Sequence, residues 1–90
     1  MKKAAHYLTV KEQDHAMRIF EKVVDKVDGS RALARATGIN AANQTQVRRR
    51  RCVPEHWCHE LVELAAEHGM SIDLNDLRPD MVRRWTLVTH

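Results

Sequence analysis

The residues best suited to chemistry lie in the middle of the chain, where polar side chains precede four consecutive arginines. Asn and Gln amides can bond adenine bidentately, and Ala or a Thr methyl group can contact the thymine methyl. Guanidinium groups and hydroxyls bind phosphates. The residues predicted to read DNA bases are Asn40, Ala41, Ala42, Asn43, Thr45 and Gln46, and those predicted to bind DNA phosphates are Ser30, Arg31, Arg48, Arg49, Arg50 and Arg51.

The distribution of charge supports this prediction more than the net charge does. The 90 residues include fifteen Lys and Arg and twelve Asp and Glu, a formal net charge of +3. The segment 29–54 holds six arginines and no carboxylate, so the rest of the chain has a net charge of −3. A basic segment on an acidic body indicates a polyanionic partner, most often nucleic acid. A solvated, charged helix end is the alternative that composition leaves open.

Patterns for metal binding and catalysis are weaker. Two cysteines and two histidines lie within residues 52–59, but the chain has no second cysteine pair and no paired C-x-x-C spacing. It has no nucleophile elbow and no glycine-rich phosphate loop. The glutamates within residues 60–67 are expected to form a solvated acidic face. We therefore expect no enzyme, no metal site and no cofactor.

Apolar residues at helical spacing, with capping residues at the ends of each run, predict an all-α fold. The first helix has an apolar stripe that includes Ala16, Phe20 and Val23. The third has one large apolar residue, Val47, so we expect its neighbours to hold it and its polar face to be used. Five helices are expected: from Thr9 to Asp28-Gly29, from Ser30 to Gly38, from Asn40 to Arg49 or Arg50, from Pro54 to Gly69, and from Ser71 to Arg78.

The length of the chain suits one domain, which we place at residues 9–82. Residues 1–8 are expected to form a flexible N-terminal arm, and residues 83–90 a C-terminal tail or a short strand. No apolar run is long enough to span a bilayer, we expect no secretory signal, and two cysteines are too few for a disulfide framework. These features are typical of a soluble cytoplasmic protein with no membrane partner.

The second and third predicted helices have the features of a helix-turn-helix. Gly38 supplies the positive φ that turns the chain between them, and the small Ala34 allows the two helices to cross closely. Leu33, Ile39 and Val47 can fill the angle between the helices. The third helix would then present its polar residues to base edges, with the arginines at its C-terminal end on phosphates.

Four segments in this order resemble the small phage-type Cro repressors and the related YdaS-like antitoxins and regulators. They lie within GSRALARATGINAANQTQVRRRRCVPEHWC and LNDLRPDM, at residues 29–38, 40–48, 49–54 and 77–80. The family shows a G-S-x-A-L-A-x-A-x-G opening, a polar recognition helix, an R-R-x-x-V-P segment and a closing L-R-P-D. The resemblance implies a compact five-helix domain that binds operator DNA, usually as a dimer, near the nucleoid of a bacterial or phage-infected cell.

Two departures from the family affect the recognition helix. Gln44 lies where the family normally has Val or Ile, and Val47 replaces a common Trp. An unpaired buried amide costs about 1–3 kcal/mol. A Gln side chain that faces the core needs hydrogen-bond partners, so we expect a recognition helix that is tilted or looser than usual.

The function predicted is a sequence-specific double-stranded DNA-binding transcriptional regulator, a Cro-like repressor. RNA is disfavoured because the basic segment contains no stacking aromatic residue. An antitoxin that binds a cognate toxin as well as, or instead of, DNA is the alternative. One recognition helix reads only a few base pairs, so we expect a homodimer. A disordered tail is the alternative to a dimer or partner contact made by Met81, Val82, Trp85, Leu87 and Val88.

Overall fold

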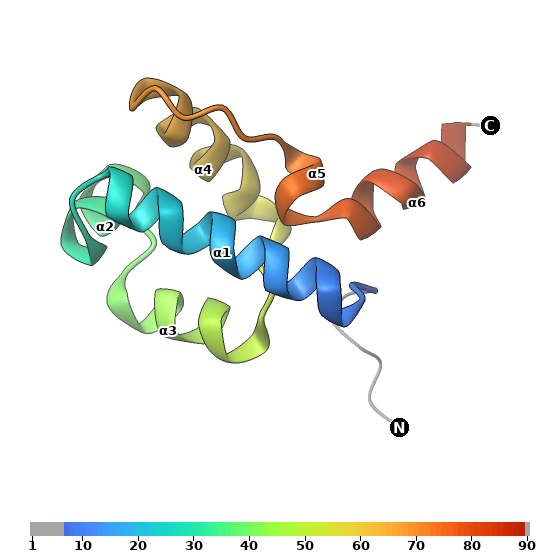
Figure 1. Ribbon diagram of the computed structural model, residues 1–90, viewed down its shortest axis with the longest axis horizontal. Helices are drawn as coiled ribbons and strands as arrows, with labels where there is room; N and C mark the ends of the chain where they lie inside the picture. Colours follow the sequence, from blue (N-terminus) through green and yellow to red (C-terminus); the bar gives the residue numbers. More distant parts are fainter. Residues whose placement is uncertain (1–6, 90) are drawn as a thin grey trace.

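Six helices make up the part of the chain that the structure, a computed structural model, describes: the backbone of residues 7–89 and the side chains of residues 7–84 (Figure 1). This part contains no strand, so the predicted all-α class is confirmed, although five helices were expected. The helices are α1 (Val10–Lys26), α2 (Ser30–Thr37), α3 (Ala41–Arg50), α4 (Glu55–Glu67), α5 (Leu74–Leu77) and α6 (Pro79–Thr89).

Two of the predicted helix starts are confirmed in detail. Thr9 and Glu12 form a reciprocal capping box at α1, in which the Thr9 amide donates to Glu12 Oε1 at 2.9 Å. Asn40 caps α3, since its side-chain oxygen accepts from the amide of Asn43 at 2.9 Å. Each bond satisfies an amide that the helix itself leaves without an acceptor.

Two other predicted caps are wrong. Ser30 is the first residue of α2, and Gly29 precedes it with φ of +107°, a conformation that glycine adopts readily. The Ser30 hydroxyl is therefore free to bond outside its own helix. The short helix α5 is capped by Asp73 rather than Ser71, because Asp73 and Asp76 form a second capping box.

The core forms around the apolar stripe of α1, as predicted. Phe20 and Val23 are fully buried there, together with Leu61 of α4 and Leu77 of α5. α1 packs against α4 and α5, and α2 packs against α3 and α4. In Figure 1, α3 and α4 lie on opposite sides of α1. α3 contributes little to this core, so most of its surface is left for other contacts.

The C-terminal segment is helical, a form that the sequence did not indicate. Residues 79–89 form α6, so the short strand is wrong, and the boundary expected at residue 83 falls inside a helix. Pro79 suits the first position of a helix, because an N–H group there has no acceptor within the helix. The negative charge of Asp80 in the first turn stabilises the helix through its dipole. Met81, expected at a dimer contact, is instead buried within the chain, and Val82 is half-buried. Three further predicted contact residues have side chains outside the described part: Trp85, Leu87 and Val88.

The chain before α1 is anchored where the structure describes it. Leu8 is buried, and the amide of Tyr7 donates to Asp80 Oδ2 at 3.1 Å. The rest of the expected N-terminal arm, residues 1–6, lies outside the described residues. None of the helices over residues 7–89 has both the length and the apolar character needed to cross a bilayer.

Candidate nucleic-acid interface

α2 and α3 are joined by a short turn that begins at Gly38. This residue ends α2 in the left-handed conformation, with φ of +81°, and its amide donates to the Ala34 carbonyl at 2.8 Å. Leu33, Ile39 and Val47, which the sequence predicted to fill the angle between the two helices, are all buried in the core. The turn and these three side chains set how α3 lies against α2.

Gln44 completes this junction with polar contacts. Its side chain is fully buried, and its amide nitrogen Nε2 donates to the carbonyl oxygens of Ser30 at 3.0 Å and Ile39 at 2.8 Å. Its Oε1 accepts a hydrogen bond from the Ser30 hydroxyl at 2.6 Å. The partners that the sequence required are therefore present, and α3 is bonded both to the start of α2 and to the turn.

The side chains predicted to read bases lie mostly on the outer surface of α3. Asn43 is half-buried and the other five are exposed. Two of them also make bonds within the protein. The Asn40 side-chain oxygen caps α3, and the Thr45 hydroxyl donates to the Ala41 carbonyl at 3.0 Å. These bonds leave the Asn40 amide nitrogen and the Thr45 methyl group available, whereas both polar groups of Gln46 are free of bonds to the described residues.

The four consecutive arginines divide into two pairs. Arg48 forms a bidentate ion pair with Glu21 of α1, at 2.8 and 2.9 Å, and its guanidinium lies over the Phe20 ring. Hydrogen bonds from Arg48 lower the pKa of the Glu21 carboxyl group. Arg51, which ends α3 in the left-handed conformation, pairs with Asp14 of α1.

Arg49 and Arg50 are exposed and form no ion pair with the described residues. The arrangement assigns Arg48 and Arg51 to holding α3 on α1, and it leaves the other two guanidinium groups free for an external ligand. The sequence could not indicate this division, because the acidic partners lie 27 and 37 residues away in the chain.

α2 carries two more exposed cations. Arg31 and Arg35 are exposed, four residues apart on one side of the helix, and form no ion pair with described residues. Arg35 belongs to the basic segment but was not predicted as a site residue. The Ser30 hydroxyl is bonded to Gln44, so a phosphate at this position would meet the uncapped backbone amides at the start of α2 rather than that hydroxyl.

A buried ion pair connects the segment after α3 to α6. The Arg78 guanidinium binds both oxygens of Asp80, at 2.9 and 3.0 Å, and Nη1 donates to the Val53 carbonyl at 3.0 Å. Burial raises the pKa of Asp80, but the bonds from Arg78 and from the Tyr7 amide outweigh it and hold that pKa at about 2. The segment around Val53 and residues 77–80, two of the segments that resemble the Cro and YdaS-like proteins, are thus in contact.

The residues considered for metal binding do not gather into a site. The described residues contain no group of three or more His, Cys, Asp or Glu side chains placed to hold a metal ion. Cys52 and Cys58 are buried, and burial raises the pKa of both thiols, that of Cys58 to about 12.

Comparison of the chain with protein-family models, curated proteins and solved structures finds no match.

Proposed function

We propose that this protein is a sequence-specific regulator that binds double-stranded DNA through a helix-turn-helix formed by α2 and α3. The observation that carries the proposal is the division of residues on α3. Among its ten residues only Gln44 and Val47 are buried, and both serve to fasten the helix. The helix therefore contributes little to the core, while its exposed amides and small side chains are of the kinds that hydrogen-bond or contact base edges in the major groove.

The rigidity of the α2–α3 junction supports this use of α3. Direct reading of bases needs side chains held in a fixed register on the duplex. Gln44 bonds α3 to both the start of α2 and the turn. The resemblance to Cro repressors and YdaS-like regulators assigns the same role to this helix.

The free cations supply the second requirement, which is contact with phosphates. Four arginines on α2 and α3 are exposed and without carboxylate partners among the described residues: Arg31, Arg35, Arg49 and Arg50. The uncapped amides at the start of α2 add to the positive potential there. An exposed ion pair contributes only about 0–1 kcal/mol, so Arg48 is also able to leave Glu21 for a phosphate.

The salt dependence of DNA binding tests the role of these arginines. We expect the double variant Arg49→Ala, Arg50→Ala to bind all duplexes more weakly and to lower the log–log salt slope by about 0.9 for each phosphate that is no longer neutralised. The matched control replaces Lys11 and Lys26, exposed cations near the two ends of α1. A slope that falls equally in the control would show that only net charge acts. An unchanged slope in the double variant would remove these arginines from the interface.

We also propose that the regulator binds its operator as a homodimer, because one recognition helix distinguishes too few base pairs. With Met81 buried in the protomer, the proposed contact moves to the later part of α6. Deletion of residues 85–90 keeps the Arg78–Asp80 pair and should convert a dimer to a monomer in light scattering. A truncated protein that stays dimeric, both free and on DNA, would place the contact elsewhere.

A further inference from the structure

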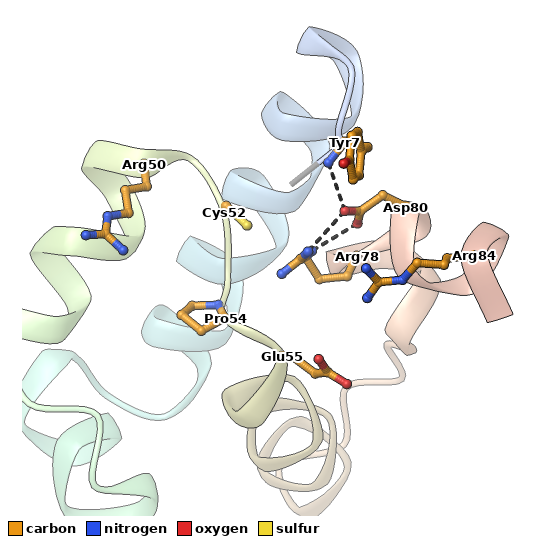
Figure 2. A pocket seen from close by; sticks show the side chains of 8 residues that line it. All are labelled: Tyr7, Arg50, Cys52, Pro54, Glu55, Arg78, Asp80 and Arg84. Carbon is orange, nitrogen blue, oxygen red and sulfur yellow. Dashed lines mark hydrogen bonds and ion pairs between the residues drawn. The ribbon is translucent and has the colours of Figure 1, made fainter. Parts of the chain in front are cut away.

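Five charged side chains line a cavity between the end of α3 and the start of α6. The cavity has a volume of about 280 Å³. Its walls come from four parts of the chain, as Figure 2 shows: the segment before α1, the end of α3 with its linker, the start of α4, and α6 with the residue before it. The lining residues are Tyr7, Arg50, Cys52, Pro54, Glu55, Arg78, Asp80 and Arg84.

The charges around this cavity favour an anion. Arg78 and Asp80 neutralise one another, which leaves two guanidinium groups, Arg50 and Arg84, against the single carboxylate of Glu55. Arg50 and Arg84 form no ion pair with the described residues, so neither has a partner to give up. In Figure 2, Arg50 stands on the α3 side and Arg84 on the α6 side, with the Arg78–Asp80 pair between them.

Arg78 adds hydrogen-bond donors that its partners within the protein do not use. A guanidinium carries five N–H donors, and Arg78 uses three of them, two on Asp80 and one on the Val53 carbonyl. Its side chain is nine-tenths buried, so the remaining donors are held in a fixed place and out of bulk water. Charge-assisted bonds to phosphate oxygens are stronger than neutral ones, and guanidinium geometry matches them well.

We propose that this cavity binds a phosphate group, whose oxygens Arg84 and the free donors of Arg78 hold while Arg50 attracts it from the α3 side. The phosphate belongs either to a free phosphate-bearing molecule or to the backbone of a bound duplex. The site goes beyond the proposed base-reading surface, because it includes α6. An occupied cavity links α3, its linker and α6 through one ligand.

Inorganic pyrophosphate and phosphate are the probes, and backbone amide shifts in NMR report where they bind. We expect saturable shifts at Tyr7, Glu55 and Arg84, and a loss of affinity of about tenfold or more in Arg84→Ala. Arg49→Ala is the matched control, since Arg49 is an exposed α3 arginine that does not line the cavity. Glu55→Gln should bind the probes more tightly, because it removes the opposing charge.

Duplex binding by the same variants distinguishes the two sources. If the phosphate is that of DNA, Arg84→Ala lowers the salt slope by about 0.9 while Lys11→Ala does not. If it is that of a free molecule, Arg84→Ala loses pyrophosphate binding and keeps its duplex affinity. Two results would overturn the proposal. The first is pyrophosphate binding that does not saturate, together with an Arg84→Ala variant whose duplex affinity and salt slope match those of Lys11→Ala. The second is an equal loss of pyrophosphate affinity in Arg49→Ala and Arg84→Ala. Saturable pyrophosphate binding by a protein that binds no duplex would support the phosphate site in the cavity and contradict the proposed DNA-binding function.

Discussion

Replacing Gln44 by Glu exchanges the amide NH2 group of a fully buried side chain for a carboxylate oxygen. The Gln44 amide nitrogen donates to the Ser30 and Ile39 carbonyl oxygens from a fully buried side chain. A carboxylate at this position has no hydrogen to donate and sets a buried negative charge against both carbonyl oxygens. An uncompensated buried charge costs about 3–5 kcal/mol, which is a large part of the stability of a small domain.

Urea denaturation followed by far-UV circular dichroism measures this cost, with Gln46→Glu as the matched control. Gln46 is exposed on the same helix, where such a change usually shifts stability by about 0.5 kcal/mol or less. Burial raises the pKa of the introduced carboxyl group above its unfolded value of about 4.3. The deficit should therefore be complete at neutral pH and shrink as the pH falls through the folded pKa. Equal stability of the two variants at neutral pH would refute the hydrogen bonding assigned to Gln44.

Three further predictions concern the ion pairs and the thiols. A double-mutant cycle on Arg48→Ala and Glu21→Ala should give a coupling of about 0.5–1 kcal/mol that decreases with salt, because the side chains are 39% and 50% exposed; no coupling at low salt would contradict the pair. The pKa of Asp80 is lowered from 3.8 to about 2, so about 2 kcal/mol of stability should be present above pH 4 and be lost as the pH falls through 2. Acid titration of Asp80→Asn should lack that loss, and an identical acid profile would count against the Arg78 contact. The Cys58 thiol, whose pKa burial raises to about 12, should react with a disulfide reagent at neutral pH only as fast as the protein opens; rapid labelling of the native protein would contradict its burial.

The parts of the fold that sequence could predict are those set by neighbouring residues. The Thr9–Glu12 capping box and the Asn40 cap each depend on side chains three residues apart, which sequence spacing shows directly. The apolar stripe of α1 likewise follows from helical periodicity. Ser30 was wrongly assigned as a cap, because a polar residue before a helix looks the same whether its hydroxyl bonds its own helix or, as here, Gln44.

The features that sequence did not predict depend on contacts between distant segments. Arg48 and Arg51 look equivalent to Arg49 and Arg50 in a run of four, and only the position of α1 distinguishes them. Met81 has no obvious core role in the sequence, and it is the path of α6 that buries it. The sequence did indicate that Gln44 needed partners, although it could not name the Ser30 and Ile39 carbonyls that fill this role.

The preference of the protein for one duplex over another tests the proposed reading of DNA most directly. Duplexes selected from a random pool, and scrambled versions of them, are bound to the wild type and to Gln46→Ala at one salt concentration. We expect selection to enrich a symmetric site, and Gln46→Ala to lose about 1–3 kcal/mol on that site and little on the scrambled duplex. A pool that yields no preferred duplex, or an equal loss on both duplexes, would contradict the assignment of α3 as a base-reading helix.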